Sequence, residues 1–522
     1  MSNGQTNPRN PAVTERTTLL PPRPNAEDGQ PRSEVVRDAS AKPTRQVAPD
    51  ALRGLLMALM AFDHANVNYS VYPHGTSIHN ESASEVVTEF STGTGFVLRL
   101  LSHLCASGFA LLLGFGLTFF VTSRAQRGWK ARAQIGYLAK RAFAILVVNE
   151  ATFLPFIAQA PVWMVNIVLP ALAIDYLLIG LVLVALDYYV QPALERLRIS
   201  GKKQTPASSS VGDEPEERYS EPTPVSKYGS VISWSLATFL ATLFFAAAFS
   251  TIWTAPNQGR CPHSTNSDTV HSLIAPWLDK KCKSSPSLIV QFFFLAEMCP
   301  NFGVISVFPP MAWISFVLLG VLYARVILRL KTSQKGLIAF NAALGLVFAL
   351  LFVSTRLLRY GNLSTDCLQT AAQLHQRAGQ NPYLADLKSF LYVTKYNPDP
   401  AFVFLTSSVN FFLLAFFGAL FSLPAILPLR ILQNFLLTLG VQALFFYAFH
   451  QLLLMFSAEA ARKLVPGLFG PTDPAKFPRE NGVGWGVFFG VWAGTMVVSY
   501  YACRGFAHFK ARRGPDSIWR FV

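Results

Sequence analysis

The sequence carries little charge for its length. Charged residues make up 14% of the 522 residues and hydrophobic residues make up 51%, whereas a soluble domain usually has about 25% charged residues. This scarcity of charge excludes an ordinary water-soluble protein, because too little polar surface is left to cover the apolar side chains. Composition therefore favours a chain that lies in lipid.

Acidic residues are fewer than basic residues. The chain has 29 Asp and Glu against 44 Lys and Arg, a formal net charge of +15. Such an excess could indicate a nucleic-acid-binding protein. Many of the basic residues instead lie in short segments beside hydrophobic runs, which is how the topology of membrane proteins is encoded. We therefore expect the lipid membrane, and no nucleic acid, as a partner.

The chain also lacks an apolar run near its start. Residues 1–47 are polar and rich in Pro, which excludes a cleaved secretory signal of the usual form. The first hydrophobic span must then direct insertion into the membrane. We expect a disordered cytosolic tail over 1–47 and a low-complexity, disordered cytosolic insert over 191–229.

Long hydrophobic runs, in contrast, recur along the chain. A helix needs about 20 mostly apolar residues to cross about 30 Å of hydrocarbon. The runs predict an all-α fold, a polytopic transmembrane helical bundle of about ten helices in one domain over 48–510. A shorter apolar stretch, 286–300, favours a re-entrant or interfacial helix. The predicted spans are 51–69, 96–121, 142–160, 164–187, 231–253, 303–328, 336–357, 401–424, 433–457 and 484–503.

Basic residues predict which side each loop faces. Segment 124–141 carries six Lys and Arg, whereas 70–93 has none and carries three Glu. The first segment is therefore expected in the cytosol and the second on the opposite side. An even number of spans then places both termini, including the tail 511–522, in the cytosol. Loops 254–302 and 358–400 fall on the lumenal or outer side.

Ionisable side chains inside the first two spans indicate a functional site, because such groups are costly in hydrocarbon. Arg53 and His64 are eleven residues apart, about three helical turns, so they share one face. Asp50 lies about one turn before Arg53 and can pair with it. His64 lies about 20 Å deeper than the start of its span. His103, in the second span, reaches a similar depth, so the two imidazoles are expected in the same half of the membrane.

Each of these groups has a structural alternative. Asp50 and Arg53 could simply anchor a helix at the interface, and a lone intramembrane histidine such as His450 is often an interhelical hydrogen-bonding group. Glu150 and Asp175 could form pairs with nearby basic residues. Two imidazoles at matched depth favour catalysis, because histidine can take a proton from an amine or hydroxyl near neutral pH. It could instead carry an acyl group itself.

Several motifs resemble the family of the heparan-α-glucosaminide N-acetyltransferase catalytic domain, among the integral-membrane acyltransferases, and its microbial branch most closely. The sequence departs from the family at Ser107 and Asn397, where Pro is expected, and in the insert 191–229. The similar blocks follow the family order from about 48 to 510. They are Asp50–Leu55 with Asp63 and His64, His103–Gly114, Lys140–Phe143 with Glu150, Phe308–Trp313 with Gly320, Phe390–Pro398 with Lys395, and Leu439–His450.

The resemblance implies transfer of an acetyl group from cytosolic acetyl-coenzyme A to an amine or hydroxyl of a glycan or sugar across the membrane. It implies no metal. A membrane of the ER, Golgi, vacuole or lysosome, or the plasma membrane, would suit such an enzyme, and a homodimer stays open. The implied catalytic residues are His64, His103 and Asp63, the implied donor-binding residues are Asp50, Arg53 and Arg141, and the second-rank residues are Glu150, Lys395 and His450.

Two other classes stay open. A transporter or permease would also suit ten helices with intramembrane carboxylates and helix-breaking prolines, although the sequence has no convincing inverted repeat. A non-catalytic homologue could act as a scaffold, against which the intact Asp-Arg-His spacing of the first span argues. The acceptor, N- against O-acylation, and direct transfer against an acyl-histidine intermediate are left open as well.

Overall fold

The computed structural model describes about three fifths of the chain. The predicted tail 1–47 except Val47, the insert 191–229, the fifth span 231–253 and the loop 70–93 except Gly93 lie outside the described residues. The described residues are 47–69, 93–157, 162–190, 288–294, 297–301, 303–330, 333–359, 379–393, 398, 400–424, 426–469, 482–514, 517, 519 and 521.

Helices dominate this part of the chain, which confirms the predicted all-α bundle. The longer helices are α1 (Val47–Tyr69), α3 (Gly93–Gln126), α4 (Ala131–Ile157), α5 (Leu169–Ala185), α11 (Pro310–Leu330), α12 (Gln334–Leu357), α15 (Pro400–Leu420), α16 (Leu427–Val441), α17 (Ala443–Leu464) and α18 (Trp485–Ala511). The shorter ones are η1 (Leu186–Val190), α10 (Leu288–Phe294), η5 (Pro382–Leu384), α14 (Leu387–Leu391) and η6 (Pro466–Leu468).

Seven of the described helices are long and apolar enough to cross a membrane: α3, α5 extended to Tyr189, α11, α12, α15, α17 and α18. Helices α1 and α4 form at the first and third predicted spans but are not among the seven, and both carry ionisable side chains. The ninth predicted span, 433–457, was wrong as one helix. The helix is interrupted at Gln442, so α16 ends and α17 begins inside that span.

A small three-stranded sheet replaces helix at the edges of three predicted segments. Strand β1 (Met164–Asn166) pairs in parallel with β3 (Val304–Ser306), and β2 (Glu297–Asn301) pairs with β3 in the antiparallel direction. The buried Asn166 side chain donates to Ser306 Oγ (2.8 Å) and to the Phe308 carbonyl (3.0 Å). The sheet therefore joins the start of α5 to the start of α11, a long-range pairing that hydrophobicity alone did not predict.

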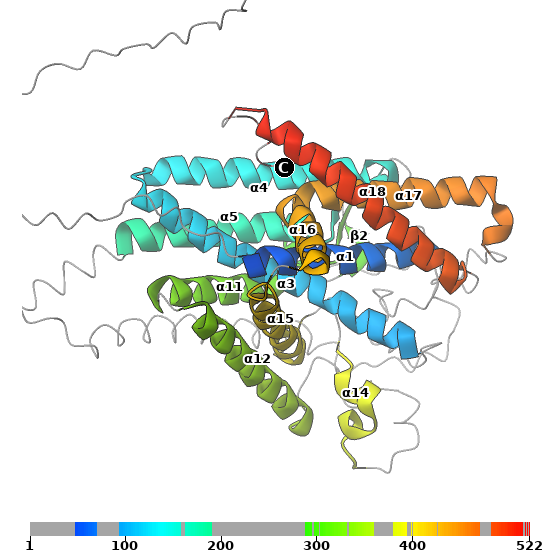
Figure 1. Ribbon diagram of the computed structural model, residues 1–522, viewed down its shortest axis with the longest axis horizontal. Coiled ribbons are helices and arrows are strands. Elements are labelled where there is room, and N and C mark those ends of the chain that lie inside the picture. Colours follow the sequence, from blue (N-terminus) through cyan, green and yellow to red (C-terminus); the bar gives the residue numbers. More distant parts are fainter. Residues whose placement is uncertain are drawn as a thin grey trace, which may run out of the picture. The chain divides into compact units, whose positions relative to one another are not determined.

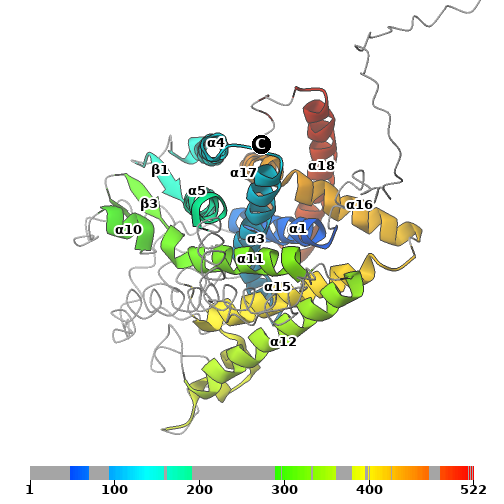
Figure 2. The same ribbon diagram turned by 90° about the vertical axis from the view of Figure 1, so that its left-hand side faces the viewer.

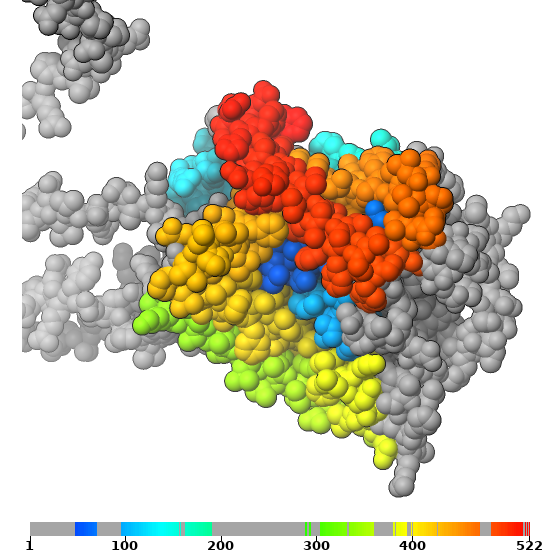
Figure 3. All heavy atoms as spheres, turned by 45° about the vertical axis from the view of Figure 1, so that its right-hand side comes forward, coloured from blue at the N-terminus to red at the C-terminus, as the bar shows by residue number. Residues whose placement is uncertain are grey.

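Helix α1 is the central element of the bundle. It packs against α3, α15, α16, α17 and α18, as Figure 2 shows. In the space-filling view only small parts of α1 (blue) are visible between α16 and α18 (Figure 3). Figure 1 shows α18 crossing α16 and α17, and α12 lying beside α15. Of the ionisable residues of α1, Asp50 and Asp63 are therefore buried in protein, and Arg53 and His64 are partly buried.

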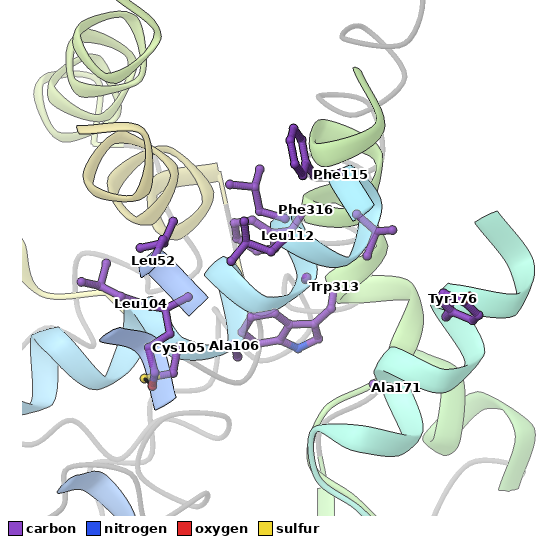
Figure 4. Packing of buried hydrophobic residues seen from close by; sticks show 14 of the residues in the cluster. Leu52, Leu104, Cys105, Ala106, Leu112, Phe115, Ala171, Tyr176, Trp313 and Phe316 are labelled. Atoms are coloured by element: carbon purple, nitrogen blue, oxygen red, sulfur yellow. Dashed lines mark hydrogen bonds between the residues drawn. The ribbon is translucent and has the colours of Figure 1, made fainter. Parts of the chain in front are cut away.

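Apolar side chains from several helices form one core around α1 and α3. Figure 4 shows Leu52 of α1, Leu112 of α3, Trp313 and Phe316 of α11 and Tyr176 of α5 among its members. Each of these five side chains is at most 4% exposed. Dense packing of this kind holds the helices that carry the polar residues described below.

Two glycines set how closely α1 and α16 approach. A Cβ atom on Gly54 would overlap the carbonyl oxygen of Leu436, and one on Gly440 would overlap the carbonyl oxygen of Asp50. Small residues allow such close backbone contact between membrane helices. The crossing places the C-terminal end of α16 directly against the first turns of α1, next to Arg53.

Candidate active site

A cavity of about 270 Å³ lies between α1, α3, α4, α5 and the α16–α17 junction. Most of its wall is apolar, and the ionisable groups in the described lining are Arg53, Arg141, Tyr176 and Tyr447. The lining residues are Arg53, Met57, Phe109, Leu112, Leu113, Gly116, Leu117, Phe120, Arg141, Ile145, Val168, Leu169, Leu172, Tyr176, Gly440, Val441, Ala443, Leu444, Tyr447 and Phe521. The cavity therefore combines an apolar wall with two cations.

Arg53 is held at this cavity by two acceptors. Its Nη1 donates to Asp50 Oδ1 at 2.9 Å and to the carbonyl oxygen of Gly440 at 3.4 Å. The expected pairing of Asp50 with Arg53 is confirmed. The Arg53 side chain is still about a quarter exposed, and it lines the cavity. Asp50 thus orients the Arg53 guanidinium while part of the Arg53 side chain stays exposed.

Arg141, on α4, is the second cation of the cavity. Its guanidinium carbon lies 5.5 Å from the ring centroid of Tyr176, a cation–π contact. The Tyr176 side chain is buried, so the aromatic ring supports the cation on its protein side. Two predicted donor-binding residues, from helices far apart in sequence, therefore meet in one cavity.

His64 lies on α1 further from the arginines, and the structure pairs it with His450 of α17. Its Nδ1 lies 2.9 Å from Nε2 of His450, and the two ring planes differ by only 3°. His450 is fully buried, and its Nδ1 lies 2.7 Å from the carbonyl oxygen of Phe446. Sequence spacing alone did not predict this pair, because 386 residues separate its members.

Tyr447 connects the cavity with the histidine pair. It is one of the lining residues, and its ring lies edge-on to His64 (centroids 6.3 Å apart) and to His450 (6.1 Å). Tyr447 therefore lies between the two imidazoles and the apolar cavity that holds Arg53 and Arg141. This arrangement can hold an anionic ligand at one end and handle a proton near the other.

His103 occupies a different environment. It is fully buried on α3, with Nδ1 2.6 Å from the carbonyl oxygen of Arg99 and Nε2 3.2 Å from that of Val393. Arg99 Nη2 donates to the same Val393 carbonyl at 3.1 Å. Both nitrogens of His103 face backbone oxygens, and the ring, like that of His64, is not among the described lining residues of the cavity. The contacts of His103 therefore tie α3 to the segment after α14.

The remaining predicted residues are spread over the bundle. Asp63 is buried on α1, where the Nδ1 atom of the neighbouring His64 ring is directed to His450. Glu150 is partly buried on α4 and accepts from Asn149 Nδ2 at 3.1 Å. Lys395 lies outside the described residues.

Two buried arginines were missed by sequence reasoning. Arg99 and Arg356 are each only 2% exposed, and Arg356 donates to the carbonyl oxygens of Phe390 (3.1 Å) and Tyr392 (2.6 Å). The signal was available, because both lie within or beside predicted apolar spans, and Arg99 stands one turn before His103. Both arginines hold the segment that also accepts from His103.

Comparison with known proteins identifies one family over most of the chain. A family model described as an acyltransferase domain matches residues 46–504. This range includes α1, His450 and all the lining residues of the cavity except Phe521. No curated protein matches the chain.

Proposed function

This chain belongs to the acyltransferase domain family, and on that premise we propose that it is a transmembrane acetyltransferase. In the proposed reaction, an acetyl group moves from cytosolic acetyl-coenzyme A to an amine or hydroxyl of a glycan or sugar on the lumenal or outer side. The observation that carries the proposal is the cavity that extends from Arg53 and Arg141 to Tyr447, beside the pair of His64 and His450.

Arg53 and Arg141 are the proposed donor-binding residues. The donor supplies a thioester, whose thiolate is a good leaving group, at the end of an uncharged arm that leads from a phosphorylated nucleotide. Guanidinium groups bind phosphate oxygens through charge-assisted and often bidentate hydrogen bonds. Asp50 holds Arg53 in place before a ligand arrives, and apolar residues such as Leu112 and Phe109 suit the uncharged arm.

His64 is the proposed general base, in preference to His103. The acceptor amine or hydroxyl gives its proton to the imidazole as its nitrogen or oxygen bonds to the acyl carbon, the carbon–sulfur bond breaks, and the thiolate takes the proton back from His64. Each transfer therefore leaves the imidazole neutral. His64 lies next to Tyr447, which lines the cavity, whereas both nitrogens of His103 lie against backbone carbonyls.

The charge of the donor accounts for the proposed direction of transfer. A charged nucleotide cannot enter hydrocarbon cheaply, so the small acetyl group has to travel further than its carrier. With the basic segment 124–141 in the cytosol, the arginine end of the cavity would receive the donor from that side. The acceptor would then approach His64 from the lumenal or outer side.

The proposed acceptor follows from the motifs that resemble heparan-α-glucosaminide N-acetyltransferase. A terminal amino sugar is the first acceptor to test, and a sugar hydroxyl is the second. The proposed location is a membrane of the secretory or vacuolar system or the plasma membrane, with both termini in the cytosol. A homodimer is proposed as the assembly to test by sizing the purified protein.

Transfer of labelled acetyl groups tests this function. The full chain in lipid nanodiscs is incubated with acetyl-coenzyme A labelled in the acetyl group and with glucosamine-terminated oligosaccharides, and label on the sugar is expected. His64→Ala should lower the rate of transfer about 10²–10⁴-fold, while Arg132→Ala, at an exposed residue of α4, should not change it. A transporter would leave all label on coenzyme A. The proposal would be refuted if the protein neither bound acetyl-coenzyme A nor transferred the label to any sugar.

A further inference from the structure

The ring of His450 makes two hydrogen bonds that together determine where its proton lies. Its Nδ1 is 2.7 Å from the carbonyl oxygen of Phe446, one turn earlier on α17. A carbonyl oxygen only accepts, so Nδ1 of His450 must carry a hydrogen. A neutral imidazole has one N–H and one lone pair. Nε2 of His450 is therefore an acceptor.

The proton position on His64 follows from the same reasoning. Nε2 of His450 lies 2.9 Å from Nδ1 of His64. Two lone pairs facing each other at this distance would repel, and two imidazolium rings so close together would repel more strongly. Nδ1 of His64 must therefore be the donor. In the neutral ring this leaves the lone pair of His64 on Nε2.

We propose that His450 is a positioning residue that fixes the tautomer of His64 and so makes Nε2 of His64 the basic atom of the site. The catalytic meaning of this inference rests on the proposed acyltransferase function. The tautomer itself is a property of the resting protein and does not depend on a substrate. A backbone carbonyl on α17 thereby selects which atom of a side chain on α1 can take a proton.

The same chain of hydrogen bonds stabilises His64 after it has accepted a proton. The acceptor's proton arrives at Nε2 of His64, and the positive charge of the imidazolium strengthens the bond from Nδ1–H to His450, because charge-assisted bonds are stronger than neutral ones. The Phe446 carbonyl dipole, behind His450, points its negative end toward this charge. When the leaving thiolate takes the proton, both rings return to their original tautomers, so His450 neither gains nor loses a proton.

The packing around His450 favours one ring orientation. Its ring stacks on Phe446 (centroids 4.7 Å apart) and lies edge-on to Tyr447 (6.1 Å). A ring flip would break the bond to the Phe446 carbonyl and leave a buried carbonyl and a buried N–H without these partners, which is costly. The orientation that fixes the His64 tautomer is therefore the one that packing and hydrogen bonding both support.

Nitrogen NMR measures this tautomer directly. The full chain, labelled with ¹⁵N-histidine and held in detergent micelles, gives two-bond ¹H–¹⁵N spectra in which protonated and unprotonated ring nitrogens differ strongly in shift. His64→Ala and His450→Gln spectra assign the two rings. The expected wild-type result is protonated Nδ1 and unprotonated Nε2 at His64. A wild-type His64 with its proton on Nε2 would overturn the inference.

Two substitutions of His450 separate tautomer selection from packing. His450→Gln offers a carbonyl oxygen near the position of Nε2, so it should keep the His64 tautomer and most of the turnover. His450→Leu offers no acceptor, so the tautomers should mix and the His64 imidazolium should lose its charge-assisted hydrogen bond. kcat should then fall about 10–100-fold, with KM for acetyl-coenzyme A unchanged. His508→Gln, at an exposed histidine of α18, is the matched control and should change neither.

The two proposals can fail separately. If wild type transfers no acetyl group, the proposed function fails, while the NMR spectrum still decides the tautomer. If His450→Leu keeps the wild-type tautomer and kcat, or if folded His450→Gln loses both, the positioning role is contradicted. Should His450→Leu fail to fold, the wild-type spectrum and the Gln variant still give the decision.

Discussion

His64 and His103 are both histidines inside the bundle, but their ring nitrogens meet different kinds of partner. On the α1–α17 side, His64 meets another imidazole and Tyr447, and Tyr447 lines the cavity that also holds two arginines. On the α3 side, His103 meets the backbone oxygens of Arg99 and Val393. Depth in the membrane, which the sequence suggested for both, is therefore not what separates the proposed base from the histidine bound to backbone oxygens. The partner of each ring nitrogen separates them.

The largest expected effect distinguishes these two histidines directly. His64→Ala should lower kcat for acetyl transfer about 10²–10⁴-fold, because general-base catalysis typically contributes that much. His103→Ala should keep the turnover of the folded fraction and instead lower the unfolding temperature. Labelled transfer together with thermal unfolding in the same detergent checks both. Equal losses of kcat in two well-folded variants would remove the difference on which this comparison depends.

The arginines of the cavity sharpen the comparison from the donor side. Arg53→Ala should raise KM for acetyl-coenzyme A about 10–100-fold, because a hydrogen bond to a charged group contributes about 1.5–3 kcal/mol. Arg141→Ala should act in the same direction, and Arg132→Ala, exposed on the same helix as Arg141, is the matched control. Direct coenzyme A binding separates affinity from turnover. An unchanged affinity in both cavity variants would exclude this end as the donor site.

The α1–α16 crossing tests whether backbone contact positions Arg53. Gly440→Ala would press a methyl group against the carbonyl oxygen of Asp50, so we expect a loss of about 1–3 kcal/mol of stability, as in other overpacked sites. KM for the donor should rise with it. Gly490→Ala on α18, where a Cβ has open space, is the control. Thermal unfolding and donor binding measure the two effects, and a neutral Gly440→Ala would contradict the close contact.

The smallest expected effect comes from the partner of Arg53. Asp50→Asn keeps an acceptor for Nη1 but removes the opposite charge. Because Arg53 is partly solvent-exposed, the loss should be no larger than that of other exposed ion pairs, which is about a twofold to fivefold rise in donor KM. Titration with coenzyme A measures it. A loss as large as that of Arg53→Ala would mean that Asp50 has a role beyond orienting the guanidinium.

Local patterns predicted the elements of the bundle well. Runs of apolar residues marked helices at every predicted span within the described residues, and a spacing of three residues was enough to predict the Asp50–Arg53 pair. The break at Gln442 was not predicted, because α16 and α17 are both apolar and hydrophobicity alone does not show a change of direction. The β1–β3 pairing was not predicted for another reason, because its strands are 140 residues apart.

The site was predicted in part, and its gaps have a physical cause. Arg53, Arg141 and His64 were singled out by charge, spacing and resemblance, and the first two line one cavity. His450 ranked low because nothing in its local sequence indicates a partner on α1. His103 ranked high because depth in a span says nothing about which atoms its ring nitrogens meet.

By itself, the sequence determined that the chain forms a helical membrane bundle with costly polar groups on its first helix, because hydrophobic length and charge act locally along the chain. Only the tertiary structure decided which of those groups meet. Hydrogen bonds form between atoms about 3 Å apart, and the atoms that define the His64–His450 pair come from helices at opposite ends of the chain. Packing around α1 brings them within that distance.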